Sequence, residues 1–577
     1  MRRIREEPQS QPHPEPESVT EQAVPAGTIF DALEATAAAG RGSLVFHLPK
    51  GVVEVRTPQL VEEARARAAT LHSWGIRQGD RVGVLGMNDP EWAMWAFGAW
   101  AAGAVLAPIP YSLRPGDREG LAERIEILAR AAGCRVVMTD PRFATYLPEV
   151  ATPWDVDSAA LLPEGDRPAV DMSDAAIVQF TSGSTANPKP LVVSHRAVLS
   201  LVDSVLTLFG TPDVDRHLSW LPFFHDWGLI HFLVMSQVTG VDSHILPTER
   251  FARAPQDWLR LVDEVNATFT GGPPSAWAVA LRLVAERRQR VDLSSLRYCL
   301  LGAEMIEPEV LDRLIEDGGR LGLDPSALAC GWGLAEATFC LTCPAPGVGP
   351  RIDTIDANAL IDESRAVPLT GPGKRIVGAG TAMPGVRVRI VGEDGAVVPE
   401  RSVGEIQAWA PYLMEGYLRP VATSPFTDDG WLRTGDLGYL ADEDLFITGR
   451  IKDLIIVFGR NYAPEDVEWA AARVPGVRAG RAVAFAKPDG HEGEFVVAVE
   501  ARGPETTDGL DDLPAQVKQV VAEEVGIVPT HVVIVPKGWI PRTTSGKLRR
   551  SAAREGYAKG EIGSLVSAGE SPPVAAT

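Results

Sequence analysis

A short polar loop carries the side chains best suited to hold an anion. Hydroxyl and backbone N–H groups in such a turn can converge on one phosphate. Apolar runs at 175–180 and 191–193 predict a strand on each side, and the Gly-Lys-Ser/Thr ending of P-loop ATPases is missing. The loop suits a triphosphate, with a solvated surface turn as the alternative. Its residues are Thr181, Ser182, Gly183, Ser184, Thr185, Ala186, Asn187, Pro188 and Lys189.

Bulk properties exclude several classes of protein. With 577 residues the chain needs at least two domains, and its net charge of −21 disfavours nucleic acids and anionic membranes as partners. No run of about 18 apolar residues predicts a membrane span. Residues 1–25 lack the apolar core of a signal peptide, so we expect a disordered leader and a cytoplasmic protein. Five cysteines, mostly in apolar runs, fit a reducing compartment better than a disulfide framework.

Helical patterns alternate with short apolar strands from residue 26 onward, which predicts an α/β fold with parallel sheets. Residues 370–434 change to short β segments rich in glycine and proline, which favour a small β-barrel. A compact α/β module follows Arg450, and we expect the tail at 563–577 to be disordered. In open α/β sheets, ligands bind beyond the carboxyl ends of the strands. Three polar turns are therefore candidates for one cleft: residues 222–226, 271–275 and 302–304.

Taken in chain order, these segments resemble the motifs of the adenylate-forming enzymes, the superfamily of acyl-CoA synthetases, luciferases and peptide-synthetase adenylation domains. The resemblance covers nearly all of residues 26–560. It implies a large N-terminal adenylation domain at 26–450, built of two doubly wound α/β subdomains and the small barrel. It also implies a small, mobile α+β C-terminal domain at 451–562.

The resemblance assigns a nucleotide site. The polar loop matches the phosphate loop and implies ATP, with Mg²⁺ held by Thr185 and Glu336. Ala186 and Pro190 stand where glycines are usual, and both restrict the backbone, so we expect slower loop closure. Trp332 replaces the usual tyrosine whose ring packs on adenine. The other nucleotide contacts implied are Gly302, Ala303, Glu304, Gly331, Gly333, Ala337, Thr338, the ribose-matched Asp436 and Arg450, and Lys452 at the hinge.

The implied reaction is attack of a carboxylate oxygen on the α-phosphorus of ATP, with departure of pyrophosphate. Because two anions meet, charge neutralisation and positioning are the main tasks. Lys547 matches the lysine that bridges the carboxylate and the α-phosphate, and we expect its loop to be exposed. His225 matches a gate between the ATP and acid sites, with a structural histidine as the alternative.

Three stretches resemble the fatty acyl-AMP ligase branch, which passes its acyl-adenylate to a carrier protein. They are the turn 220–230, the segment 459–468 and an extended segment at 351–374, placed like an insertion that limits CoA use in relatives. We therefore expect an acyl-AMP ligase that loads an acyl carrier protein in polyketide, peptide or lipid biosynthesis. Alternatives are an acyl-CoA or aryl-CoA synthetase, transfer to a small nitrogen nucleophile, and a non-catalytic relative. A basic cluster could meet the carrier's phosphopantetheine phosphate: Lys547, Arg549, Arg550 and Arg554.

The expected acid pocket carries bulky, partly polar side chains. His231 and Phe232 stand where small residues are usual, and such groups would shorten or polarise an acyl tunnel. We expect a medium-length, functionalised or aromatic acid rather than a long plain fatty acid. The pocket residues so assigned are Asp226, His231, Gly271, Pro274, Ser275 and Trp277.

Overall fold

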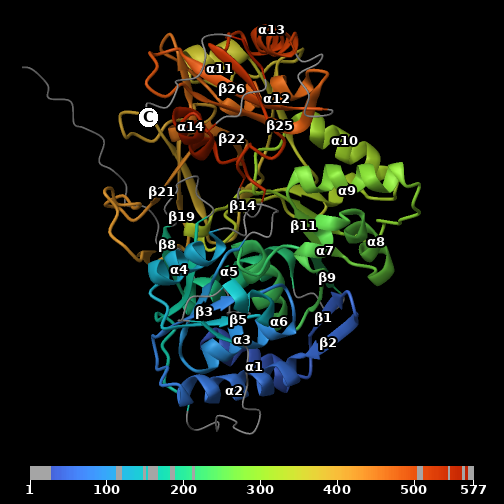
Figure 1. The fold of residues 1–577 in the computed structure, drawn as a ribbon, viewed down its shortest axis with the longest axis vertical. Helices are drawn as coiled ribbons and strands as arrows, with labels where there is room; N and C mark the ends of the chain where they lie inside the picture. The colour runs from blue at the N-terminus through green and yellow to red at the C-terminus, as the bar shows by residue number, and fades with distance from the viewer. Residues whose placement is uncertain are drawn as a thin grey trace, which may run out of the picture.

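The computed structural model describes residues 27–111, 120–146, 151–153, 167–181, 189–210, 215–502, 511–542, 546–561 and 566–568 (Figure 1). The expected leader and most of the phosphate loop, including Ser182, Gly183, Ser184 and Thr185, lie outside the described residues. None of the helices in these ranges is both long and apolar enough to cross a bilayer.

One seven-stranded sheet carries the polar loop at a hairpin. Its order is β20-β8-β7-β4-β3-β5-β6, with β3, β4, β5 and β7 paired in parallel. β7 and β8 are antiparallel and pair Phe180 with Pro190, which confirms the strand–turn–strand prediction. The bounds are β3 Arg81–Leu85, β4 Val105–Pro108, β5 Val136–Thr139, β6 Ala151–Pro153, β7 Ala175–Phe180, β8 Pro190–Ser194 and β20 Gly416–Tyr417.

A second seven-stranded sheet carries the three polar turns. Its order is β13-β12-β11-β9-β10-β1-β2, parallel except for the β1–β2 pair. Parallel strands bring their carboxyl ends to one edge. The bounds are β1 Ser43–Leu48, β2 Gly51–Arg56, β9 Arg216–Ser219, β10 Asp242–Ile245, β11 Phe269–Gly272, β12 Tyr298–Leu301 and β13 Leu328–Cys330.

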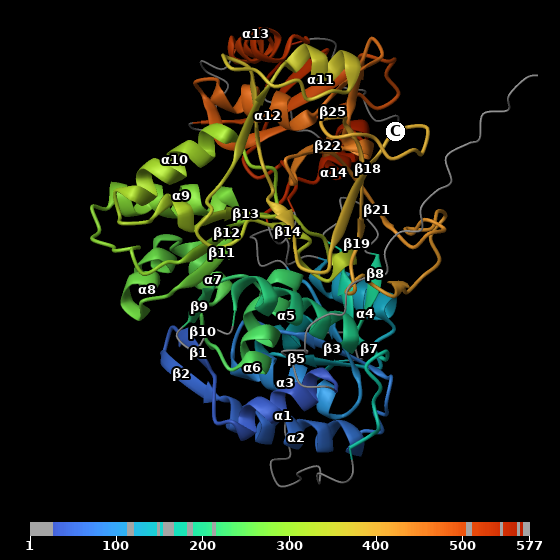
Figure 2. The same cartoon turned by 180° about the vertical axis from the view of Figure 1, so that it is seen from behind.

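Helices cover both sheets and bury a shared core (Figures 1 and 2). α3 shows why such helices form: Asp89 caps it by accepting the N–H of Trp92 at 3.1 Å, and Pro90 occupies the first turn. The helices are α1 Ile29–Ala38, α2 Thr57–Ser73, α3 Pro90–Ala101, α4 Leu121–Ala132, α5 His195–Phe209, a π-helix at Trp227–Met235, α6 Ser236–Thr239, α7 Thr248–Arg253, α8 Gln256–Val265, α9 Pro274–Glu286 and α10 Pro308–Gly319.

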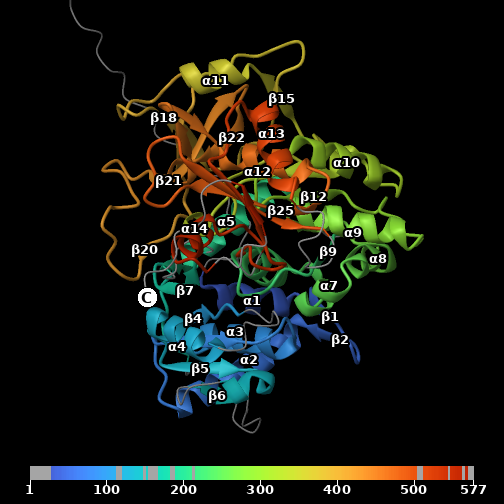
Figure 3. The same ribbon diagram turned by 45° about the horizontal axis from the view of Figure 1, so that its top comes forward.

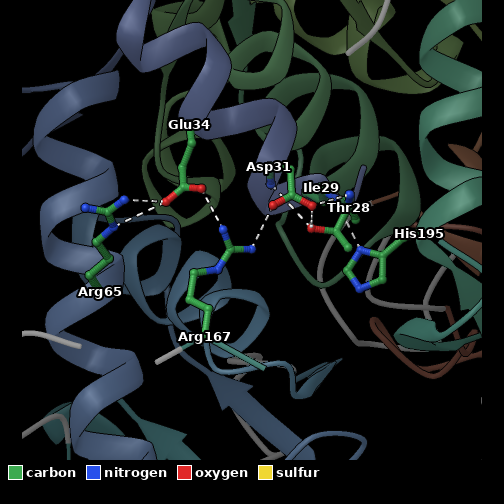
Figure 4. Close-up of polar contacts among 7 residues, drawn as sticks. All are labelled: Thr28, Ile29, Asp31, Glu34, Arg65, Arg167 and His195. Atoms are coloured by element: carbon green, nitrogen blue, oxygen red, sulfur yellow. Dashed lines mark hydrogen bonds and ion pairs between the residues drawn. The ribbon is translucent and has the colours of Figure 1, made fainter. Parts of the chain in front are cut away.

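Ion pairs fix helix α1 to the rest of the large domain (Figure 4). Arg167 bridges Glu34 at 2.6 Å and Asp31 at 3.0 Å, and Arg65 reaches Glu34 at 2.6 Å. The first N–H of α1 donates to Nδ1 of His195 at 3.3 Å. Burial lowers the pKa of His195 to about 4, so the ring accepts this bond in its neutral form.

The region expected to form the barrel is built around an antiparallel sheet in the order β18-β19-β21-β22, which runs on to Arg450. The expected insertion is bracketed by the antiparallel pair β15–β16 and contains a short helix, α11. The bounds are β14 Thr342–Cys343, β15 Ile352–Ile355, α11 Ala357–Glu363, β16 Lys374–Val377, β17 Thr381–Ala382, β18 Arg387–Val391, β19 Gly404–Trp409, β21 Leu432–Ala441 and β22 Asp444–Arg450.

The C-terminal domain has its own core and lies against the large domain (Figure 3). Its sheet has the order β25-β26-β27-β28. The strand at 566–568 pairs with β27, so this piece of the expected disordered tail extends the sheet. The elements are β23 Ile455–Val457, β24 Arg460–Tyr462, α12 Pro464–Arg473, β25 Val477–Ala486, β26 Phe495–Ala501, α13 Leu513–Val525, β27 His531–Val535, α14 Arg550–Ala558 and β28 Val566–Ala568.

Candidate active site

The polar turns predicted to share a cleft do meet at one edge of the second sheet. Glu304, after β12, accepts the backbone N–H of Ser275, after β11, at 2.8 Å. A Cβ on Gly302 would lie 2.9 Å from the carbonyl oxygen of Gly331, and one on Gly333 only 1.9 Å from that of Phe339. The strand ends approach so closely that these positions exclude a side chain.

Glu336, the expected Mg²⁺ ligand, has a partner that the sequence did not reveal. Oε1 of Glu336 accepts the hydroxyl of Tyr417 at 2.8 Å. The ammonium of Lys189 lies 5.8 Å from the centre of the same tyrosine ring. Tyr417 is on β20, which pairs with β8 and so carries the ring to the base of the phosphate loop. Because β20 is two residues long and distant in sequence, no local pattern identifies this tyrosine.

A single carboxylate such as Glu336 fits the way proteins hold Mg²⁺. This ion is usually bound by one or two carboxylates together with substrate phosphates and water. Among the described residues there is no group of three or more histidine, cysteine, aspartate or glutamate side chains that could hold a metal ion. Thr185, the other expected ligand, lies outside those residues.

Asp436, the expected ribose contact, is held by two side chains. The indole N–H of Trp332 donates to Oδ2 at 2.9 Å, and Nε of Arg450 lies 2.6 Å from Oδ1. Asp436 is only 4% exposed. The charge of its carboxylate raises the pKa of Arg450. Arg450 ends β22, directly opposite Asp436 on β21, so the register of one antiparallel pair sets this contact.

The residues expected to form the gate make a compact pair at the start of the π-helix. Nδ1 of His225 lies 2.7 Å from Oδ1 of Asp226, which also accepts the N–H of Trp227 at 2.6 Å. Burial alone would raise the pKa of Asp226, but His225 and Lys547 together bring it below its usual value.

Lys547 reaches the large domain from the C-terminal domain. It interacts electrostatically with Asp226, Asp436, Glu304 and Arg450, four residues expected at the site. Lys547 is half-buried rather than exposed, and residues 543–545 of the loop expected to be exposed lie outside the described residues. Burial lowers the pKa of its ammonium, and Asp226 opposes that effect. The structure therefore brings a cation toward Asp226 and Asp436, the carboxylates expected at the gate and at the ribose.

Arg550 does not belong to a basic surface, and the expected phosphopantetheine cluster is wrong at this position. Its guanidinium lies 2.7 Å from Glu468, 2.9 Å from Glu465 and 3.4 Å from Asp453. Burial, together with the Glu468 carboxylate, raises the pKa of Glu465. Asp453 follows Lys452, the expected hinge residue, so Arg550 ties the segment after Lys547 to the expected hinge and to α12.

The phosphate loop is described only at its two ends. Thr181 donates its N–H to the carbonyl of Lys189 at 3.4 Å. Pro190 is the first residue of β8, and its carbonyl accepts the N–H of Leu418 at 2.8 Å. Proline is tolerated at the start of a strand because its missing N–H removes no inner ladder bond. The effect of Ala186 on loop closure falls outside the described residues.

The expected acid-pocket residues fall into two groups. His231 is buried near Trp227, and a Cβ on Gly271 would lie 2.5 Å from Trp227. Trp277 instead packs on Trp258 in the core, with ring centroids 4.4 Å apart. Pro274 starts α9 and Ser275 is exposed beside it. Of the expected pocket residues, His231 and Gly271 therefore lie on the side of Trp227, next to the expected gate.

The two-sheet fold and the carboxylates at its edge define an enzyme that handles a nucleotide. The chain matches the AMP-binding enzyme family over residues 47–418 and the AMP-binding enzyme C-terminal domain over residues 466–547. The protein belongs to this family and is an adenylate-forming ligase.

Its relatives include acyl-AMP ligases. The chain is 32% identical to the long-chain-fatty-acid–AMP ligase FadD26 of Mycobacterium marinum, over 88% of this chain and 92% of that protein. It is 29% identical to the medium-chain-fatty-acid–acyl-carrier-protein ligase JamA of Moorena producens, over 89% and 91% respectively. A solved structure from a study of fatty acyl-adenylate ligases of E. coli and L. pneumophila superposes with a TM-score of 0.85, at 29% identity, over 92% of this chain and 98% of that one.

Proposed function

We propose that the protein activates a medium-length, functionalised carboxylic acid as an acyl-adenylate and then transfers the acyl group to the phosphopantetheine thiol of an acyl carrier protein. The position of Lys547 supports the first step most directly, because it places a cation beside Asp226 and Asp436. In that step a carboxylate oxygen bonds to the α-phosphorus of ATP, and the bond from that phosphorus to pyrophosphate breaks.

Each residue has a role in this proposal that its contacts support. Lys547 neutralises the two anions that meet, and Asp436 with Arg450 and Trp332 orients the ribose. Glu336, oriented by Tyr417, holds Mg²⁺, which would neutralise charge on the phosphates. His225 and Asp226 separate the nucleotide from the acid. In the transfer step the carrier's thiol gives its proton to solvent and its sulfur bonds to the acyl carbon. AMP leaves with the pair of electrons from the broken C–O bond.

The expected insertion supports a carrier protein over CoA as the acceptor. Asp362 in α11 lies 2.8 Å from Arg460 of the C-terminal domain, and Ile361 packs on that domain's core. Lys374 at the end of the insertion pairs with Asp466 in α12. These contacts oppose a rotation of the C-terminal domain that would carry Lys547 away from the large domain. The relative JamA is itself named for an acyl-carrier-protein acceptor.

The experiment measures acid-dependent release of pyrophosphate over a panel of carboxylic acids. CoA or a holo carrier protein is then added, and the thioester is sought by mass spectrometry. Transfer to the carrier alone is expected. Transfer to CoA would place the protein among the acyl-CoA synthetases, and no release with any acid would indicate a binding role.

A further inference from the structure

A column of aromatic rings leads from the gate into the large domain. Trp227, the residue after the gate aspartate, lies 5.7 Å from Phe339 between ring centroids, and Phe339 lies 5.8 Å from His231. His231 stacks on Phe269 at 4.5 Å and on His217 at 5.3 Å, the latter with only 12° between the ring planes. The π-helix supplies two of these rings, β9 one and β11 one. Because His217 and Phe269 are paired on neighbouring strands, the column follows one face of the second sheet.

Two nitrogens in this column are buried without a hydrogen-bond partner among the described residues. They are Nδ1 of His217 and Nε2 of His231, and each residue is only 4% exposed. Burial lowers the pKa of His217 to about 4 and holds the pKa of His231 well below its usual value. Both rings are therefore neutral at neutral pH, and each offers one donor and one acceptor.

The other buried and half-buried histidines of the described chain differ from this pair. Each makes a hydrogen bond through a ring nitrogen, as when Nε2 of His47 meets Nδ1 of His244 at 3.0 Å. Buried polar atoms in native proteins nearly always have partners, so two unpartnered nitrogens in one stack need an explanation. The partnered histidines are His47, His72, His195, His225, His244 and His531.

We propose that His217 and His231 form a subsite that hydrogen-bonds a hydroxyl group on the acyl chain of the substrate. A hydroxyl both donates and accepts, so it suits either tautomer of each ring, whereas a keto oxygen only accepts. The phenyl rings around the pair, those of Phe232, Phe269 and Phe339, would face the methylene groups on either side. The inference rests on the proposed acyl-activating function and narrows its substrate to hydroxylated acids.

The test compares decanoic acid with its monohydroxy and oxo derivatives, each with the functional group at successive positions along the chain. Wild-type protein should show a kcat/KM for pyrophosphate release at least about tenfold higher for one hydroxy isomer than for decanoic acid. His231→Phe keeps an aromatic ring but removes the nitrogens, so it should lower this ratio to near one, whatever its absolute rate with decanoic acid. His231→Asn keeps a donor and an acceptor and should restore part of the preference.

A matched control removes a buried histidine elsewhere. His47→Phe breaks the imidazole pair that His47 on β1 makes with His244 on β10, and it should leave the acid preference unchanged. If wild-type protein prefers decanoic acid, or if the hydroxy preference survives in both His231→Phe and His217→Phe, the subsite does not exist and buried water serves these nitrogens. A clear preference for an oxo acid would overturn the hydroxyl assignment. Absence of pyrophosphate release with every acid would overturn the proposed function and the subsite with it.

Discussion

The indole N–H of Trp332 donates a hydrogen bond to Oδ2 of Asp436 across 2.9 Å. The residue expected to pack on adenine therefore also orients the carboxylate expected to bind the ribose. Both side chains are buried, and they lie 104 residues apart in the chain. A tyrosine at this position would present its hydroxyl at a different place from the indole nitrogen.

Trp332→Phe removes this donor and keeps a flat ring. One lost hydrogen bond is worth about 1 kcal/mol, so the KM for ATP should rise about fivefold with a smaller change in kcat. Steady-state pyrophosphate release at varied ATP checks this. Trp100→Phe, which breaks the buried indole bond to the Ala176 carbonyl, is the control and should lower thermal stability without changing the KM for ATP. An unchanged KM for ATP in Trp332→Phe would show that the bond from Trp332 to Asp436 does not contribute to binding of the ribose.

Lys547 should set the alkaline limit of adenylation. The protonated ammonium is the active form, and burial lowers its pKa, so activity should fall as pH rises, at lower pH than for an exposed lysine. Lys547→Ala should reduce pyrophosphate release by about 10²–10³. In Lys547→Arg the guanidinium stays charged at every accessible pH. The pH profile of this variant should therefore lack the alkaline fall, even if its rate is lower. The same alkaline limb in Lys547→Arg would assign the limit to another group.

Tyr417→Phe should weaken the binding of Mg²⁺ at Glu336 without impairing folding. Without the hydroxyl, Glu336 loses the bond that orients it, and the Mg²⁺ concentration for half-maximal rate should rise several-fold, by about the worth of one hydrogen bond to a charged group. Tyr439→Phe is matched, because it removes a tyrosine hydroxyl from Asp353 at 2.9 Å, away from the site. Equal Mg²⁺ dependence in the two variants would contradict the orienting role.

The insertion should control the choice of acceptor. Asp362→Arg places two cations together where Asp362 and Arg460 now pair, so the C-terminal domain should be released and thioester formation with CoA should increase. The double variant with Arg460→Asp restores an ion pair and should return CoA transfer toward the wild-type level. Mass spectrometry of the thioester measures both. If transfer to CoA does not increase in the single variant, this ion pair does not control the choice of acceptor.

Arg550 should position the segment that carries Lys547. Arg550→Met leaves Glu465, Glu468 and Asp453 without their cation, so acyl-adenylate formation should fall by about tenfold or more. Transfer from an acyl-adenylate supplied directly should change less, because that step does not use Lys547. Arg554→Met alters an exposed neighbour and should preserve both steps. Equal losses in the two steps would indicate a general loss of folding instead.

Several features of this protein could be predicted from residues that are neighbours in the sequence. Apolar runs identified the strands on both sides of the polar loop, and Asp89 with Pro90 identified the start of α3, because strands and caps depend on neighbours in sequence. Motif order also predicted the family and the edge of the second sheet where the turn at Glu304 meets the turn at Ser275. These features follow from short stretches of sequence, which one chain displays directly.

Only the tertiary structure decided which side chains touch. The Tyr417–Glu336 and Trp332–Asp436 bonds join residues 81 and 104 positions apart, so no periodicity reports them. Burial of Arg550 among three carboxylates reversed the expectation of a basic surface, since a sequence shows charges but not their partners. The stacked His217 and His231 come from a strand and a π-helix that meet only when the sheet is covered.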